Sequence, residues 1–327
     1  MRRASSNRVP GILTLLMCLA IPGIGAVACE DNAPRVTVSG ISAGAYAAVQ
    51  AHVALSGSIS GVAAVAGGPY HCAAGSLVNA LGRCISGSDL DVAPLIEDAR
   101  SAASAGAIDP VESMSNDRVW IFHGQGDAVV KAAVTAALGD FYAAFLPEQA
   151  IALVDEIPAA HGWPTLDQGV ACGEMGGDYI NACNYDAAGE LLQHLYGPLK
   201  PPTAARDDGL QPLDQASIVP EGGSFAESGF AYVPAACTEA AGECRLHLVF
   251  HGCRQGKQFI DDRFARMSGF NEWAESNRII VLYPQVNKSL MNPQGCWDWW
   301  GYTGADYDRR SGKQTAGVAA LIEAWSE

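Results

Sequence analysis

The sequence predicts an α/β fold with a mostly parallel central sheet and helices on both faces. Short β-branched runs bounded by Gly, Pro or Asn alternate with longer Ala-rich segments, a pattern typical of buried parallel strands joined by helices. One early strand runs directly into the sharp turn Gly40-Ile41-Ser42-Ala43-Gly44. The expected strands are 35–39, 62–66, 118–122, 151–155, 230–234, 245–250 and 279–283, and the expected helices are 43–55, 91–104, 129–145, 185–196, 258–276 and 315–325.

The first 28 residues have the features of a signal peptide. Three arginines precede an apolar run over 11–20, and Ala26-Val27-Ala28 is a small-residue cleavage site. The apolar run is too short for a confident membrane span, and no later segment reaches the necessary length. We therefore expect residues 29–327 to be secreted or periplasmic, and their length suits a single large α/β domain. A lipid anchor at Cys29 is the less favoured alternative.

The chain is acidic, with a formal net charge of −15 that becomes about −18 when the three leader arginines are removed. An acidic surface argues against nucleic acid or an anionic membrane as a partner. We expect a monomer with no transmembrane segment.

The cysteines of an exported chain are expected to form disulfides rather than metal sites. Cys18 leaves with the leader, and the best pairing of the others leaves Cys29 unpaired. Sequence alone does not fix the connectivity. The favoured pairs are Cys72–Cys84, Cys172–Cys183, Cys237–Cys244 and Cys253–Cys296.

The turn around Ser42 matches the G-x-S-x-G nucleophile elbow, which exposes a serine hydroxyl between a strand and a helix. Two segments that normally precede this elbow in α/β-hydrolases instead follow it by about two hundred residues. They are a buried strand ending in His251-Gly252 and a later one ending in Tyr283-Pro284. The sequence therefore predicts a circularly permuted α/β-hydrolase fold, in which the Pro-, Asp- and Gly-rich surface connection 199–223 joins the permuted halves.

A serine nucleophile needs a base, and the base needs an orienting acid. Asp127 follows the strand 118–122 and His161 follows the strand 151–155, in the order found in α/β-hydrolases. We therefore expect a Ser42–Asp127–His161 triad. The rival acids are Asp117 and Asp155, the rival base is His123, and the remaining histidines considered, His71, His194 and His247, have a simpler structural interpretation.

Two further segments are candidates for the site. The tetrahedral oxyanion needs two amide donors, for which the N–H groups of Ala43 and Cys253 are the best placed. A short aromatic segment between Pro, Gly and Asp residues resembles a loop that lines a cleft, and a Cys253–Cys296 disulfide would tie it to the oxyanion segment. Its candidate substrate-binding residues are Trp297, Trp299, Trp300 and Tyr302.

The motifs together resemble those of extracellular short-chain-length poly(3-hydroxyalkanoate) depolymerases with the type 2 catalytic domain. Besides the early elbow, the resemblance is carried by Ala66-Gly-Gly-Pro-Tyr-His-Cys72, Phe250-His-Gly-Cys-Arg-Gln255 and Gly295-Cys-Trp-Asp-Trp-Trp-Gly-Tyr302. The resemblance implies a permuted α/β-hydrolase fold and the roles given above for Ser42, Asp127, His161 and Cys253. It also implies contacts between a polyester and the aromatic loop.

We therefore expect a serine esterase that hydrolyses poly(3-hydroxybutyrate), related short-chain polyhydroxyalkanoates or their oligomers, with no metal or cofactor. Residues 29–327 are expected to form its single catalytic domain, without a separate polymer-binding domain. One alternative is a feruloyl or acetyl esterase acting on plant polysaccharide, since aromatic cleft residues also suit a feruloyl ring. A second is a non-catalytic polymer-binding protein, against which the Ser-Asp-His order argues.

Overall fold

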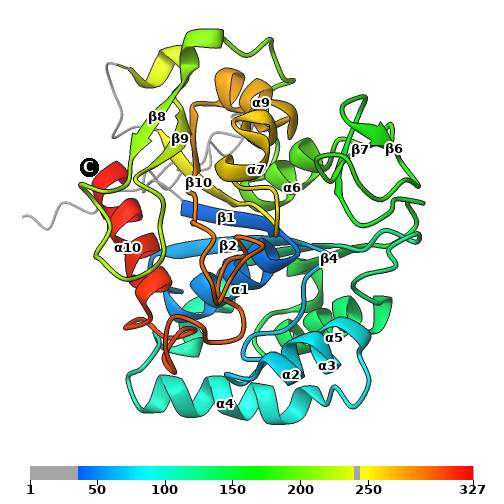
Figure 1. Cartoon of the computed structure of the whole chain (residues 1–327), viewed down its shortest axis with the longest axis vertical. Coiled ribbons are helices and arrows are strands. Elements are labelled where there is room, and N and C mark those ends of the chain that lie inside the picture. The colour runs from blue at the N-terminus through cyan, green and yellow to red at the C-terminus, as the bar shows by residue number, and fades with distance from the viewer. Residues whose placement is uncertain (1–35, 239–243, 327) are drawn as a thin grey trace, which may run out of the picture. The chain divides into compact units, whose positions relative to one another are not determined.

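The computed structural model describes residues 36–238 and 244–326 (Figure 1). The segment 1–28, predicted to be a signal peptide, and Cys29 lie outside the described residues. In the part that is described, the main sheet has the strand order β4-β3-β2-β1-β10-β11-β9-β8. Its strands are β1 (Val36–Ile41), β2 (Ile59–Val65), β3 (Arg118–Phe122), β4 (Ile151–Val154), β8 (Leu210–Asp214), β9 (Ser228–Tyr232), β10 (Arg245–Phe250) and β11 (Ile279–Tyr283).

Strand β1 lies between β2 and β10, although β10 follows it by about two hundred residues. Gly40 of the elbow strand is in register with Phe250 at the end of β10. The six strands from β4 to β11 in this order pair in parallel, whereas β9 pairs antiparallel with both of its neighbours, β11 and β8. This arrangement confirms the permuted, mostly parallel sheet that the sequence predicts.

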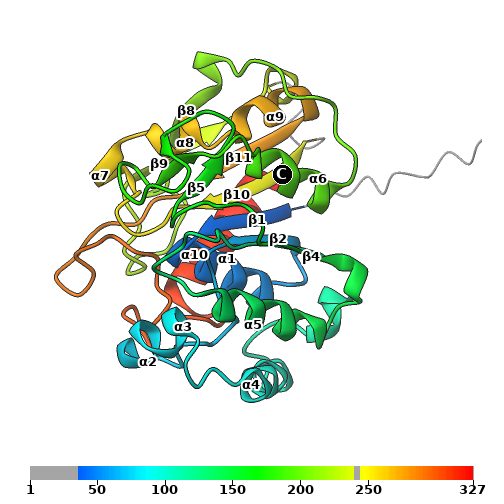
Figure 2. The same ribbon diagram turned by 90° about the vertical axis from the view of Figure 1, so that its right-hand side faces the viewer.

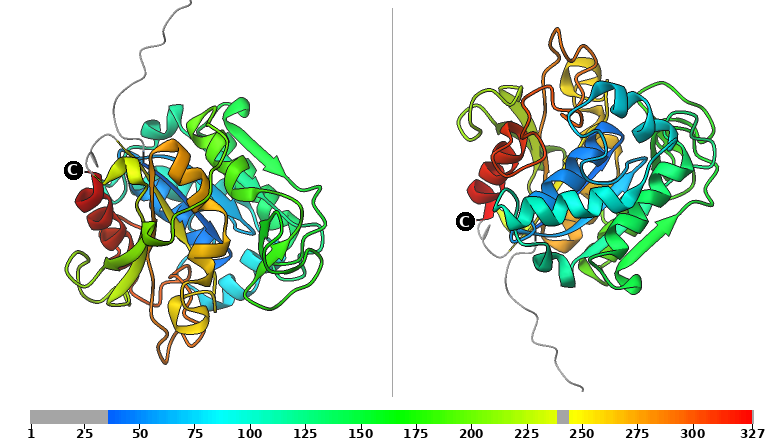
Figure 3. Two further views of the ribbon diagram at one scale, coloured as in Figure 1. Left: turned by 90° about the horizontal axis from the view of Figure 1, so that it is seen from above. Right: turned by 90° about the horizontal axis from the view of Figure 1, so that it is seen from below.

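Helices cover both faces of this sheet, as Figure 2 shows with the sheet near edge-on and Figure 3 shows from above and from below. One layer contains α1, α5 and α10, with α4 outside it, and the other contains α6 and α9. The helices are α1 (Ala43–Ala54), α2 (Leu77–Leu81), α3 (Arg83–Ser86), α4 (Val92–Ser104), α5 (Ala132–Ala143), α6 (Ala187–Tyr196), α7 (Lys257–Ile260), α8 (Arg263–Met267), α9 (Phe270–Asn277) and α10 (Lys313–Ser326). None of the described helices is long and apolar enough to cross a bilayer.

Alternation along the central strands builds a separate core on each face. In β10, Leu246 and Leu248 pack into the core that includes α1, whereas Val249 packs into the core that includes α6 and α9. Strands that are buried on both faces have nearly continuous apolar sequences. Their ends are therefore easy to recognise, and β3, β10 and β11 have the bounds expected from the sequence.

A buried polar network joins β1 to β10 in the middle of the sheet. His247 of β10 lies 2.7 Å from the Thr37 hydroxyl through Nδ1 and 2.8 Å from the Ser39 hydroxyl through Nε2. Complete burial lowers the pKa of His247 to about 3, so this imidazole is neutral and can both donate and accept. His247 therefore has the structural role expected from the sequence.

Three expectations are corrected. The helix expected over 258–276 is three short helices, because Asp261 and Gly269 adopt positive φ angles of 51° and 86° at the breaks. The connection 199–223 contains the edge strand β8, which pairs with β9. A second small sheet was not anticipated, and it consists of β5 (Trp163–Thr165), β6 (Val170–Ala171) and β7 (Ile180–Ala182).

Candidate active site

Ser42 lies at the turn between β1 and α1. Its φ is 56° and its ψ is −123°, a conformation that L-residues rarely adopt and that the surrounding structure must enforce. The Ser42 N–H donates to the Val65 carbonyl of β2 over 2.9 Å. A Cβ on Gly40 would overlap the Gly44 carbonyl. The spacing of the glycines around Ser42 is therefore a steric requirement of the turn.

Gly44, the second glycine of the turn around Ser42, allows α1 to pack closely against the end of β10. A Cβ on Gly44 would overlap the Phe250 carbonyl and lie 2.5 Å from the His251 oxygen. A Cβ on Gly252 would lie 3.5 Å from the Ser42 Cβ. The segment that follows β10 is therefore a direct neighbour of the serine.

His161 and Asp127 form a buried pair. The His161 Nδ1 lies 2.8 Å from Asp127 Oδ2, while Asp127 Oδ1 accepts the N–H groups of Val129 and Val130 over 2.8 and 2.9 Å. Both carboxylate oxygens thus have partners, which fixes the carboxylate plane. An ionised carboxylate at Nδ1 places the imidazole proton there and leaves Nε2 free to accept another.

The loops that carry this pair are bonded to each other. They follow the parallel neighbours β3 and β4, so both emerge at the same edge of the sheet. The N–H groups of Gln125 and Gly126 donate to the carbonyls of Ile157 and Ala159 over 2.8 and 2.9 Å. A Cβ on Gly124 would overlap the Ala159 carbonyl, so this position also requires glycine.

Ser42 and His161 line one cavity of about 500 Å³. The oxyanion candidate Cys253 and the neighbouring Gly252 also line it. Most of the remaining wall is apolar, and it includes Ile41, Leu77, Leu81, Ile85, Val129, Met175, Met291, Pro293, Trp299 and Trp300. A cavity of this size with few polar groups is typical of a site for an uncharged, largely apolar ligand.

The candidate oxyanion donors are the amide of Ala43, which directly follows Ser42, and the amide of the cavity residue Cys253. Within the described residues, no acceptor takes either N–H. The amides beside Cys253 are engaged, since Gly252 donates to Gln255 Oε1 and Arg254 donates to the Gln294 carbonyl, each over 2.8 Å. Helix geometry leaves the Ala43 amide without a carbonyl in its own helix.

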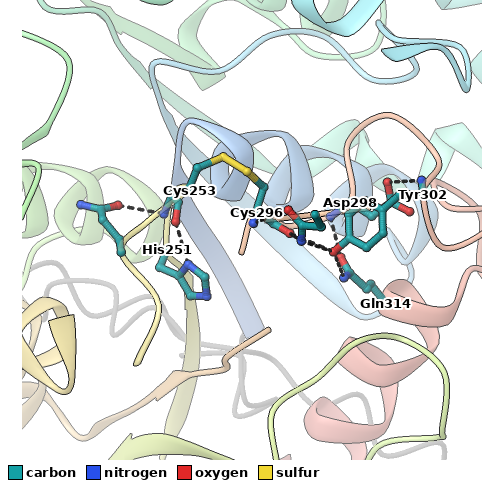
Figure 4. Close-up of a disulfide and its surroundings, with 9 residues drawn as sticks. His251, Cys253, Cys296, Asp298, Tyr302 and Gln314 are labelled. Carbon is teal, nitrogen blue, oxygen red and sulfur yellow. Dashed lines mark hydrogen bonds between the residues drawn. A yellow bond between two sulfur atoms is a disulfide. The ribbon is translucent and has the colours of Figure 1, made fainter. Parts of the chain in front are cut away.

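A disulfide between Cys253 and Cys296 holds the oxyanion candidate against the aromatic segment (Figure 4). The other three expected bridges are also formed, and they are Cys72–Cys84, Cys172–Cys183 and Cys237–Cys244. The pairing favoured from the sequence is confirmed.

The aromatic segment divides between the cavity and the core. Trp299 stacks on Tyr46 of α1 with ring centroids 4.8 Å apart, and Trp299 and Trp300 line the cavity beside Ser42. Trp297 instead is fully buried against Phe250. Tyr302 lines a different cavity, and its hydroxyl donates to the Cys296 carbonyl over 2.8 Å.

Asp298 organises this segment and was not singled out from the sequence. Its Oδ1 accepts the N–H groups of Trp300, Gly301 and Tyr302 at 3.2, 2.7 and 3.0 Å, and its Oδ2 accepts the N–H and hydroxyl of Thr303. Figure 4 shows Asp298 beside the disulfide. This role could have been suspected from the sequence, because Asp298 precedes several residues without a hydrophobic period and Asp side chains in turns commonly accept hydrogen bonds from nearby backbone amides.

The rival acids and bases have other surroundings. His123 lies with Asp155 at a separate, smaller cavity, and burial lowers its pKa although nearby Asp127 opposes this. Asp117 is paired with His52 at 3.1 Å. Two of the remaining histidines have polar partners outside the Ser42 cavity: His71 contacts Asp308, and His194 contacts the Ala150 carbonyl.

The strand order and the elbow define a circularly permuted α/β-hydrolase. No protein-family model matches the chain. A poly(3-hydroxybutyrate) depolymerase from Delftia acidovorans is 40% identical over 322 residues, which cover 93% of this chain and 64% of that protein. A polyhydroxybutyrate depolymerase from Talaromyces funiculosus is 31% identical over 311 residues, covering 89% of each chain. The chain belongs to the polyhydroxybutyrate (PHB) depolymerase family.

Solved structures agree with this membership. The crystal structure of the PHB depolymerase from Penicillium funiculosum has a TM-score of 0.83 at 29% identity and covers 90% of this chain and 96% of its own. A PHB depolymerase with a serine-to-alanine substitution, in complex with an R3HB trimer, has a TM-score of 0.84 at the same identity and coverages. The chain spans about two thirds of the length of the bacterial relative.

Gly44→Ala should destabilise the fold, because the new Cβ would overlap backbone carbonyls at the end of β10. We expect a loss of about 3 kcal/mol or more in the free energy of unfolding, measured by denaturant titration. Gly139→Ala in α5 is the matched control, since its Cβ would meet only Ile121 Cδ1 at 3.9 Å. The control should be neutral or slightly stabilising. Equal losses in the two variants would contradict the steric account.

Trp297→Ala and Trp300→Ala should affect different properties of the protein. Removing the buried Trp297 side chain should cost about 3–5 kcal/mol of stability, whereas truncating the partly exposed Trp300 should change stability little and alter KM for an ester. Unfolding midpoints and ester kinetics of the two variants measure this difference. A Trp300 variant with reduced stability and unchanged KM would show that the cavity wall is assigned wrongly.

Proposed function

We propose that this chain is a secreted serine esterase that hydrolyses ester bonds of poly(3-hydroxybutyrate), related short-chain polyhydroxyalkanoates or their oligomers. The observation that carries the proposal is the buried His161–Asp127 pair, which shares an apolar cavity with Ser42. The names of the curated relatives and the trimer held by one structural neighbour support the same substrate class. The four disulfides support export, because such bonds persist in oxidising compartments.

In the proposed mechanism, the Ser42 hydroxyl attacks an ester carbonyl while His161 Nε2 accepts its proton. Asp127 stabilises the imidazolium that forms. The amides of Ala43 and Cys253 donate to the oxyanion of the tetrahedral intermediate. His161 then protonates the leaving alcohol, and a water molecule, activated by the same imidazole, hydrolyses the acyl-enzyme.

The rim of the cavity supports an apolar polyester substrate. Leu77 and Leu81 of α2, together with Met175 and Met291, line the cavity and are exposed. Val78, which follows Leu77, and Leu290, which precedes Met291, are even more exposed. These side chains would contact a substrate that extends beyond the cavity, and apolar contact area of this kind favours binding of a hydrocarbon-rich chain.

Ser42→Ala should lower ester hydrolysis by about a thousandfold or more, because the nucleophile is lost while the fold is kept. Release of soluble 3-hydroxybutyrate products from amorphous polymer and from short oligomers measures the effect. Ser101→Ala, at an exposed position of α4, is the control and should retain full activity. Circular dichroism should be the same for both variants.

The same assay distinguishes the alternatives. A strong preference for a feruloyl ester over hydroxybutyrate oligomers would replace the proposed substrate, and undiminished hydrolysis by the Ser42→Ala variant would refute the nucleophile.

A further inference from the structure

The cavity beside Ser42 has one fixed charge in an otherwise neutral wall. Among the described residues that line it, Arg254 is the only acidic or basic side chain besides His161. The chain as a whole has a net charge of −15. A cationic group in the substrate cavity of an acidic protein therefore opposes the general charge of the molecule, and this contrast points to a local anionic ligand.

The backbone of Arg254 is held in an unusual conformation. Its φ is 63°, a value that costs energy for a residue with a side chain. The Arg254 N–H donates to the Gln294 carbonyl over 2.8 Å, and the preceding Cys253 is bonded to Cys296. The disulfide and this hydrogen bond fix the backbone at Cys253 and Arg254. The exposed Arg254 side chain therefore starts from a fixed point on the cavity wall.

The guanidinium of Arg254 has no partner among the described residues: no hydrogen bond, ion pair or ring contact engages it. The carboxylate of Asp178, next to the cavity residue Tyr179, is already bound by Arg263 at 2.7 Å. Other arginines of this acidic chain are paired with carboxylates, and they include Arg100, Arg206, Arg263, Arg266 and Arg310.

We propose that Arg254 binds the terminal carboxylate of a hydroxyalkanoate oligomer and so favours free-acid oligomers over uncharged ester chains. This inference rests on the proposed function. A guanidinium can hold a carboxylate through two parallel hydrogen bonds. The interior of a polyester has no charge, whereas every oligomer released by hydrolysis has one carboxylate at its acid end.

The direction of the ester bond fixes which part of the substrate Arg254 contacts. Attack by Ser42 forms a bond from its oxygen to the ester carbonyl carbon and breaks the bond from that carbon to the alkoxy oxygen. The fragment with the free hydroxyl end remains as the acyl-enzyme. The fragment with the terminal carboxylate leaves as a 3-hydroxy acid, protonated on its new hydroxyl. Arg254 therefore belongs to the leaving-group side of the site.

Arg254→Gln tests the proposal with two trimers of 3-hydroxybutyrate, the free acid and its methyl ester. We expect kcat/KM for the acid to fall about five- to tenfold, in line with a charge-assisted hydrogen bond, and kcat/KM for the methyl ester to change less than twofold. Arg254→Lys should retain part of the preference for the acid. The control Arg100→Gln removes the same charge from α4 at a residue that does not line the cavity, and it should change neither rate.

The preference of the parent enzyme for the acid should also weaken as salt is added, because exposed charges are screened. An equal fall for acid and methyl ester in both Arg254 variants, or no fall for either, would overturn the role of Arg254. If the parent hydrolyses neither trimer, the proposed function fails instead.

Discussion

The carbonyl oxygens of Phe250 and His251 occupy the space where a side chain at position 44 would begin. This close contact between the first helix and the end of β10 is the constraint on which the candidate site depends. It brings Ser42 beside Gly252, so that a serine near the start of the described chain and an amide two hundred residues later face one cavity. Only glycine at position 44 allows the two backbones to approach so closely.

The chemistry of the site follows from how its parts are held. Asp127 is fixed by two backbone amides and by His161, and the loops of this pair are joined by further backbone hydrogen bonds. In the aromatic segment, the Cys253–Cys296 disulfide and the hydrogen bonds from backbone amides to Asp298 hold the chain in place. Polar groups at both walls are therefore ordered before a substrate binds, which is the condition for electrostatic stabilisation of a transition state.

The sequence was most informative where hydrophobic runs and turn chemistry coincide. Strands β3, β10 and β11 could be predicted to the residue because they are buried on both faces and are therefore mostly apolar. Strand β8 could not, since Pro212 and the polar residues of an edge strand resemble a loop. The orientations of Trp297 and Trp299 were also beyond prediction, because a segment without regular secondary structure has no period that separates core from cavity.

The proposed chemistry depends on Ser42 being a nucleophile that the His161–Asp127 pair activates. The most direct measurement is covalent labelling with a fluorophosphonate, followed by peptide mass spectrometry. We expect a single adduct at Ser42 that forms in parallel with loss of esterase activity. Labelling should be slower by orders of magnitude in Asp127→Asn, where the imidazole is held in the wrong tautomer. Labelling at another serine, or full inactivation with Ser42 unmodified, would contradict it.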